Sequence, residues 1–345
     1  MFQEKNLTIR IPLVGGGDQK AYRWLALLAA FRAWLFLAIL LVVFELWAEC
    51  VYHRTFLFTA FNIQSIAVFT VTPLLLGLGQ TFVVISGGID LSVGFTMGLS
   101  AVVVAHITNA TSASVGPVGS LVIGVLAGIA VAFIPGIING LLISKLRIPP
   151  FIGTLGMYGV ARGAAYLLAR GTTVPIANGP LNFIGNGVIG PIPIVVLIAF
   201  VIVAIAHYLL SCSRFGQHIY AIGGNVQAAL RAGIDVPRNT LALYVLSAIT
   251  AAGAGILYTA RFSAGAPQAG EPILLDSIAA VVIGGASLFG GSGTIVGTVI
   301  GSLIIAVIQY GLVFVNVEPF WQFIAVGVVI IISVLVDQLQ KRARK

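Results

Sequence analysis

The feature that most constrains this chain is a series of apolar runs, each close to the length that crosses a lipid bilayer. A transmembrane helix needs about 20 apolar residues, and only 8% of this chain is charged, against about 25% in soluble domains. The runs lie at 33–51, 63–85, 92–107, 118–144, 151–169, 191–210, 241–260, 276–288, 293–315 and 319–336. The sequence therefore predicts an all-α polytopic membrane protein with about ten transmembrane helices.

Small residues recur inside these runs at a spacing that suits close helix packing. The run at 276–288 is too short to cross the bilayer alone at 1.5 Å per residue, which predicts a half-helix. Gly-x-x-x-Gly pairs let two helix backbones approach closely. The pairs are Gly94 and Gly98, Gly124 and Gly128, Gly136 and Gly140, Gly159 and Gly163, and Gly297 and Gly301.

The basic residues predict the orientation in the membrane. Most fall on one side of the predicted layout: Lys5, Arg10, Lys20, Arg23, Arg32, Lys145, Arg147, Arg214, Arg231, Arg238, Lys341, Arg342, Arg344 and Lys345. The opposite loops hold Arg54, Arg170 and Arg261. Because Lys and Arg favour cytoplasmic loops, both termini are expected to be cytoplasmic. This divides the chain into a tail and interfacial segment (1–32), a transmembrane domain (33–336) and a basic cytoplasmic tail (337–345).

Two apolar runs break at glycines in a similar way. Val83–Leu91 reads VVISGGIDL and Val281–Leu288 reads VVIGGASL. Broken helices at corresponding places in two halves of a chain point to a transport site. The similarity predicts two weakly related halves, although a chance match in a sequence rich in Val and Gly is the alternative.

The first break carries a motif, GGIDLSVG, with a carboxylate at membrane depth. Gly87 and Gly88 permit a sharp backbone turn, and Asp90 and Ser92 are placed to cap the helix that follows. An acidic residue in a membrane is also a functional candidate; we favour the capping role. Asp276 stands in the same way where the second broken helix would begin.

The segment 211–240 is the longest polar stretch between runs, and it is predicted to be cytoplasmic. Within it, Val226–Ala232 reads as a short helix that follows Gly223, Gly224 and Asn225 and ends at Gly233. Loops of this length in compact proteins are usually functional. We therefore favour a docking surface for a soluble partner over an ordinary connecting loop.

Arg162 lies near the middle of the fifth run, where an unpaired charge would cost at least about 3 kcal/mol. A carboxylate partner is expected, and the candidates are Glu45, Asp90 and Asp276. The functional reading is a residue that binds solute hydroxyls in a pathway. The structural reading, which we favour, is a buried ion pair or an Arg that reaches the interface.

Catalysis by this chain is not expected, and no catalytic residue, metal site or cofactor is predicted. A nucleotide-binding loop needs Gly-Lys-Ser/Thr, and no Lys in this chain follows a Gly. The four histidines and two cysteines show no zinc-site spacing. Any use of ATP therefore requires a second polypeptide.

Four motifs in order resemble the permease subunits of ribose-type sugar ABC importers: GGIDLSVG, PFIGTLGMYGVARG (Pro150–Gly163), RFGQHIYAIGGNVQAALRAGI (Arg214–Ile234) and DSIAAVVIGGASLFGGSG (Asp276–Gly293). The resemblance runs from about Asn62 to the C-terminus. It implies a bacterial inner membrane location, a second permease copy or paralogue, cytoplasmic ATPase subunits that hold ATP and Mg, and a periplasmic or lipid-anchored solute-binding protein.

The resemblance also implies that the 214–234 loop carries the coupling helix. The coupling residues it implies are Arg214, Phe215, Gly216, Gly223, Gly224, Asn225, Ala229, Arg231 and Gly233. The chain departs from the family at two places. Gln309-Tyr310-Gly311-Leu312 stands where Asn-Asn-Gly-Leu is common, and Gln80 stands where Met is common. The solute is therefore left open among pentoses, hexoses, polyols and nucleosides.

The predicted function is a permease that moves a small neutral solute, a monosaccharide being favoured, by alternating access. Candidate pathway residues are the polar side chains inside apolar runs: Asn62, Gln80, Thr96, Asn139 and Gln309. The alternative is an ion-coupled secondary transporter, which Gly-broken helices fit equally well. That alternative needs an intramembrane carboxylate that titrates, and Asp90 and Glu45 are the choices.

Overall fold

The computed structural model describes residues 32–318 and 320–343, and this part of the chain is largely helical. Of the predicted tail and interfacial segment (1–32), residues 1–31 lie outside the described residues and Arg32 begins α2. The helices are α2 (Arg32–Tyr52), α3 (Ala60–Ile85), α4 (Val93–Ser144), α5 (Pro150–Leu168), α6 (Gly179–Asn186), α7 (Ile194–Cys212), α8 (Arg214–Gly224), α9 (Val226–Arg231), α10 (Val236–Phe262), α11 (Glu271–Ile283), α12 (Ile295–Phe314) and α13 (Phe320–Ala343). Two short antiparallel ribbons pair β1 (Val174–Pro175) with β4 (Ala264–Gly265), and β2 (Val188–Ile189) with β3 (Ile192–Pro193).

Six of the described helices are long and apolar enough to cross a membrane: α2, α3, α4, α7, α10 and α12. The prediction of a helical multi-pass membrane protein is confirmed. The predicted runs at 92–107 and 118–144 lie in one 52-residue element, α4, which is broken by non-helical backbone at Gly116 (φ 74°, ψ 176°). The helix extends past the end of the first run, as far as this break. Glycine permits the positive φ there, and Pro117 follows it directly.

The second broken helix differs from the prediction at both ends. α11 spans Glu271–Ile283, so it begins and ends about five residues before the predicted run at 276–288. Asp276 therefore lies inside α11, and Gly270 occupies the N-cap position, so the capping role predicted for Asp276 is wrong. Pro272 stands in the first turn, where the missing N–H is not needed.

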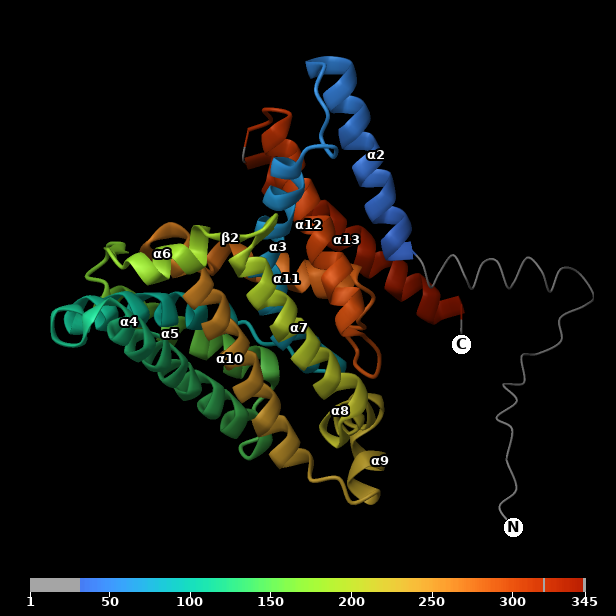
Figure 1. Ribbon diagram of the computed structural model, residues 1–345. Helices are drawn as coiled ribbons and strands as arrows, with labels where there is room; N and C mark the ends of the chain where they lie inside the picture. The colour runs from blue at the N-terminus through green and yellow to red at the C-terminus, as the bar shows by residue number, and fades with distance from the viewer. Residues whose placement is uncertain (1–31, 319, 344–345) are drawn as a thin grey trace, which may run out of the picture.

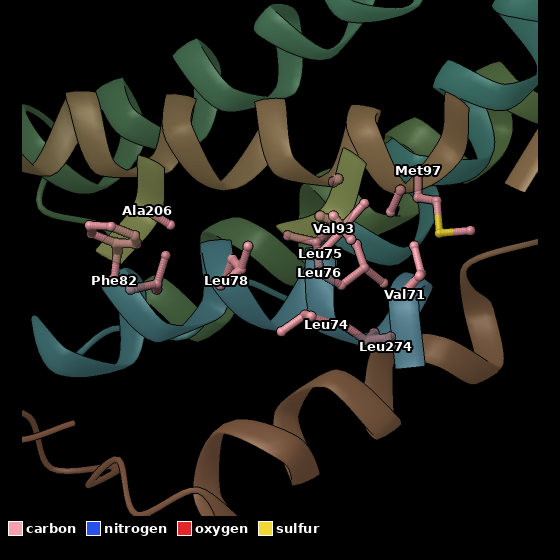
Figure 2. Packing of buried hydrophobic residues seen from close by; sticks show 14 of the residues in the cluster. Val71, Leu74, Leu75, Leu76, Leu78, Phe82, Val93, Met97, Ala206 and Leu274 are labelled. Atoms are coloured by element: carbon pink, nitrogen blue, oxygen red, sulfur yellow. The ribbon is translucent and has the colours of Figure 1, made fainter. Parts of the chain in front are cut away.

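The core of the molecule is built around α3. Its middle and C-terminal residues are almost entirely buried, including Leu75, Leu78 and Phe82. Figure 2 shows these side chains between α7, α10 and α11, with Met97 of α4 and Leu274 of α11 at one end of the cluster. Burial of an apolar helix inside other helices identifies α3 as the centre of the bundle, where lipid does not reach.

Glycine pairs bring the helices close, as the sequence predicted for four of the five pairs. A Cβ atom at Gly98 would lie 2.1 Å from the carbonyl oxygen of Pro267, and one at Gly301 would lie 1.8 Å from that of Ala280. The pair at 124 and 128 meets the part of α4 before the break, at Thr108 and Val104, and the pair at 136 and 140 meets α10, with nearest atoms 2.1–2.9 Å from an added Cβ atom. Gly159 and Gly163 on α5 differ, because a Cβ atom there would meet nothing within 4 Å.

The bundle has two distinct ends (Figure 1). Helices α8 and α9 lie at one end of α7 and α10, and α6 and β2 lie at the other. The C-terminal part of α4 packs at Gly140 against Leu241, near the start of α10. This contact places Lys145 and Arg147 at the α8–α9 end of the bundle, together with the basic residues of 214–238. At the C-terminus, α13 continues to Ala343, so the predicted basic tail at 337–345 begins as helix.

Candidate functional site

The two glycine-containing breaks end their helices with the same backbone hydrogen bonds. After α3, Gly87 and Gly88 donate to carbonyls three and five residues earlier, each at 2.9 Å. After α11, Gly285 and Ala286 repeat the pattern at 3.0 and 3.1 Å. Gly87 (φ 84°) and Gly285 (φ 96°) both adopt the left-handed conformation that this kind of helix end requires. The local similarity of the two breaks is therefore structural, while the relation between whole halves stays a prediction.

The two breaks meet each other and the end of α8. Gly291 N–H donates to the carbonyl oxygen of Ile85, the last residue of α3, at 2.8 Å. A Cβ atom at Gly223 would lie 1.7 Å from that same oxygen. The Tyr220 hydroxyl donates to the carbonyl oxygen of Gly293 at 2.6 Å. A phenol is already protonated at neutral pH, and burial raises the pKa of Tyr220 further, so its hydroxyl is the donor in this bond.

The short helix predicted after residue 225 is confirmed as α9. The Asn225 side chain accepts a hydrogen bond from the Ala228 N–H at 3.0 Å and so caps the start of α9. Gly233 (φ 81°) follows its end. Val226 and Leu230, one turn apart, are 43% and 46% exposed. This end of the bundle thus presents a short helix with two exposed apolar side chains.

The nine predicted coupling residues occupy both the buried and the exposed sides of 214–233. Gly216 and Ala229 are buried, and Phe215 and Gly223 are half-buried. Exposed positions are Arg214, Gly224, Asn225, Arg231 and Gly233. The helix α8 itself was not predicted, although apolar residues at 215, 219 and 222 were its signal.

Asp90 is the centre of a buried network between α3, α4 and α10. Its Oδ1 accepts the Ser92 N–H at 3.0 Å and the Ser92 hydroxyl at 2.6 Å. Its Oδ2 accepts the Ser247 hydroxyl at 2.9 Å. Asn139 donates to the Ser92 hydroxyl at 2.9 Å, and Gln80 donates to the Asp90 carbonyl oxygen. Asp90 therefore fixes Ser92, the N-cap residue of α4, but the predicted side-chain cap is not formed, because within the described residues Ser92 makes no capping bond and the Asp90 carboxylate accepts only from Ser92 and Ser247.

The remaining predicted pathway residues lie in other helix contacts. Asn62 accepts the Tyr310 hydroxyl at 2.7 Å, and Gln309 donates to Asp276 at 2.7 Å. Thr96 is buried in α4. Within the part of the chain that the structure describes, the Gln80 Oε1, Thr96 Oγ1 and Asn139 Oδ1 atoms are buried without a hydrogen-bond partner.

Arg162 is exposed on α5 and lies over the rings of Phe95 and Tyr166, with its Cζ atom 5.3 and 5.9 Å from their centroids. The expected carboxylate partner is wrong for all three candidates. Asp90 and Asp276 have the partners described above. Glu45 accepts from the Thr55 hydroxyl and from two backbone N–H groups at 2.7–2.9 Å.

A match over residues 62–334 places the chain in the family described as "Branched-chain amino acid transport system / permease component". The chain belongs to this permease family. The permease is 40% identical over 269 residues to the ribose import permease protein of Bacillus subtilis (strain 168), which covers 76% of this chain and 80% of the relative. It is 37% identical over 283 residues to the D-allose transport system permease protein of Escherichia coli (strain K12), which covers 81% and 84%.

A third relative, the galactose/methyl galactoside import permease protein of Escherichia coli (strain K12), is 34% identical over 322 residues and covers 89% of the permease and 95% of its own length. No solved structure gives a significant match. The resemblance to permeases of ribose-type sugar importers is thus confirmed. The family match begins at Asn62, so α2 lies before the matched region.

Proposed function

We propose that this permease is the transmembrane subunit of an ATP-driven importer of a monosaccharide. The observation that carries the proposal is its similarity, over 76–89% of its length, to permeases named for ribose, D-allose and galactose. The family description names branched-chain amino acids instead. Because the sugar permeases share 34–40% identity with this chain, a sugar is favoured over an amino acid.

The ATPase subunit, with its ATP and Mg, is a separate polypeptide that docks on α9. The support is the geometry of the α8–α9 end. Val226 and Leu230 are exposed there, on a helix too short to be stable alone. Ala229, between them in sequence, anchors the helix because it is buried. A soluble partner that covers the two apolar side chains would remove them from water.

The permease lies in the inner membrane as ten segments, one of which (α11) is a half-helix, with both termini and the α8–α9 end in the cytoplasm. The ten segments are α2, α3, the two parts of α4, α5, α7, α10, α11, α12 and α13. The break at Gly116 supports counting α4 twice. With 13 residues, α11 is about 20 Å long and crosses only part of the bilayer. Grouping of the basic residues at the α8–α9 end supports the orientation.

A second permease copy or paralogue completes the pathway, and a solute-binding protein delivers the sugar to the α6 end. Transport follows from alternating access. Gln80, Thr96 and Asn139 are the proposed pathway residues with unused hydrogen-bonding atoms, which solute hydroxyls would take in another conformation. Asn62 and Gln309 already have partners within the chain. Gln80→Met, the residue common in the family, tests this assignment, since it should alter solute preference without loss of assembly.

An ion-coupled carrier is the competing function. It requires a carboxylate that is free to exchange protons or bind a cation during transport. Asp90 is held by three hydrogen bonds, and Glu45 is also held by three. These hydrogen bonds give both carboxylates a structural role. Neither is then needed for ion coupling, which supports the ATP-driven function.

The test is gentle purification of the tagged permease from its native membrane, followed by identification of bound proteins and uptake in liposomes. A stoichiometric subunit with nucleotide-binding motifs, together with ATP-dependent uptake of D-ribose, D-allose or D-galactose, is the expected result. ATP-dependent uptake of leucine instead would place the permease with amino acid transporters. Uptake driven by an ion gradient without any ATPase would overturn the proposal.

A further inference from the structure

The end of α8 is packed onto the end of α3 with no room for a side chain between them. A Cβ atom at Gly223 would lie 1.7 Å from the Ile85 carbonyl oxygen and 2.7 Å from the Gly291 nitrogen. A Cβ atom at the neighbouring Gly224 would meet nothing within 4 Å. Gly223 therefore makes a backbone contact that its neighbour in the same helix does not.

The turn between α11 and α12 (residues 284–294) is bonded to the end of α3 and to α8. Gly290, Gly291 and Gly293 all have positive φ (85°, 78° and 154°), a conformation that other residues rarely adopt. Ser287 N–H donates to the Ser292 carbonyl oxygen at 3.0 Å, which closes the turn internally. Its links to the rest of the molecule include the Gly291 bond to Ile85 and the Tyr220 bond to Gly293.

The apolar side chains of α8 pack on the core of the bundle. Phe215 stacks on Phe82 of α3, with ring centroids 6.2 Å apart. Ile219 and Ile222 are buried. Only Asn225 separates α8 from α9, and it caps α9 directly. A displacement of α9 must therefore move α8, and α8 cannot shift without moving or breaking its contacts with both helix breaks.

We propose that Tyr220 and Gly223 are positioning residues that transmit movement of α9 to the 284–294 turn and to the end of α3. The inference rests on the proposed function, in which an ATPase grips α9. In this arrangement, the Tyr220 hydrogen bond and the Gly223 backbone contact connect α8, which adjoins α9, to both helix breaks. Movement caused by ATP would reach α11 and α12 through them.

The chain offers matched controls for both residues. Tyr220→Phe removes only the hydroxyl that donates to Gly293. Tyr208→Phe is the control, because it also removes one hydroxyl, but at a position on α7 that is 63% exposed. Gly223→Ala forces the α8 contact apart, and Gly253→Ala adds the same methyl group to open space on α10, outside the coupling segment. If Gly223→Ala does not accumulate in the membrane, Tyr220→Phe still tests the proposal.

The first measurement uses the complete transporter in liposomes and counts sugar molecules moved per ATP hydrolysed. The sugar is whichever of D-ribose, D-allose and D-galactose the wild type takes up. Tyr220→Phe should bind the ATPase normally yet lower this ratio about fivefold or more, as expected for loss of coupling between sites. A merely structural role would lower yield or thermal stability and leave the ratio unchanged.

The second measurement is hydrogen–deuterium exchange of peptides covering 284–294 in the same complex, with and without ATP. In the wild type and both controls, ATP should change the exchange rate of the turn, and in Tyr220→Phe this response should be lost. If Tyr220→Phe leaves both the sugar-to-ATP ratio and the ATP-dependent change in exchange as in the wild type, this inference is overturned while the proposed function stands. Equal effects of Gly223→Ala and Gly253→Ala would overturn the role of Gly223. Absence of ATP-dependent uptake by the wild type overturns the proposed function and this inference with it.

Discussion

The hydroxyl of Tyr310 on α12 donates a hydrogen bond to Oδ1 of Asn62 on α3 at 2.7 Å. Both side chains are buried, and the second group of Asn62 donates to the Thr55 carbonyl oxygen at 3.2 Å. The contact ties the first turn of α3 to the last turns of α12. Asn62, predicted as a pathway residue, has its amide satisfied within the chain in this conformation.

Tyr310→Phe should destabilise the permease by about 1–3 kcal/mol, because it leaves the Asn62 oxygen buried without a donor. The measurement is thermal unfolding of the purified protein in detergent. Tyr208→Phe, at an exposed position, is the control and should change the unfolding temperature little. A melting curve for Tyr310→Phe that overlays the wild type would show that water or another donor replaces the hydroxyl.

Gly301→Ala should be strongly destabilising, whereas Gly163→Ala should be tolerated. The first substitution puts a methyl group 1.8 Å from the Ala280 carbonyl oxygen, so α11 and α12 must separate. Overpacking of this kind costs about 1–3 kcal/mol or more. Membrane yield and thermal unfolding of the two variants give the comparison. Equal tolerance of both would mean that the α11–α12 contact is looser than the structure shows.

Removal of the α9 cap should weaken ATPase binding. Asn225→Ala deletes the side chain that accepts the Ala228 N–H, which costs about 1 kcal/mol in a helix of six residues. Asn225→Ser keeps a capping oxygen and should retain binding. Co-purification of the ATPase with each variant is the readout, and Asn225→Ser is the matched control. The docking role of α9 would be contradicted by full ATPase recovery with Asn225→Ala.

Asp90→Asn should leave uptake within a few-fold of the wild type. The amide oxygen can still accept from Ser92, and the Ser247 hydroxyl can turn to accept from the new NH₂ group, since a hydroxyl both donates and accepts. Asp90→Leu removes all these bonds and should destabilise the protein by about 1–3 kcal/mol. Uptake assays and thermal unfolding separate the two effects. Complete loss of uptake by a stable, assembled Asp90→Asn variant would favour the ion-coupled alternative.

No reciprocal charge exchange should rescue Arg162→Asp. Glu45, Asp90 and Asp276 each have other partners, and Arg162 lies over Phe95 and Tyr166. Uptake by Arg162→Asp alone and with each carboxylate changed to Arg provides the test, and Arg162→Gln should cost only about 0.5–1 kcal/mol of stability. Rescue by one of the exchanges would reveal an ion pair formed in another conformation.

The helical nature of the protein, its glycine contacts and the short helix after Asn225 could all be read from local sequence. Apolar runs of bilayer length have few alternatives to helix in lipid. A glycine between helices marks close approach whichever helix is the neighbour. The cap and the terminating glycine of α9 act over a few residues, so their effect is visible without tertiary information.

Contacts between distant elements could not be predicted. Arg162 was given a carboxylate partner because charge balance suggests one, but the aromatic rings of Phe95 and Tyr166 lie beneath it instead. Asp276 was placed at a helix start because a carboxylate commonly caps, yet Pro272 and the chain before it begin α11 earlier. The neighbours of a side chain in a bundle depend on helix packing, which a hydrophobic pattern specifies only weakly.

The sequence by itself determined that this chain is a helical membrane permease whose two broken helices share a glycine-ended motif. Those properties follow from hydrophobicity, backbone freedom and motif order along the chain. Only the tertiary structure decided that Ile85, Gly223 and Gly291 meet at one point, where the end of α8 touches both breaks. Their convergence depends on how α3, α8 and α11 pack in three dimensions, because 206 residues separate Ile85 from Gly291 in sequence.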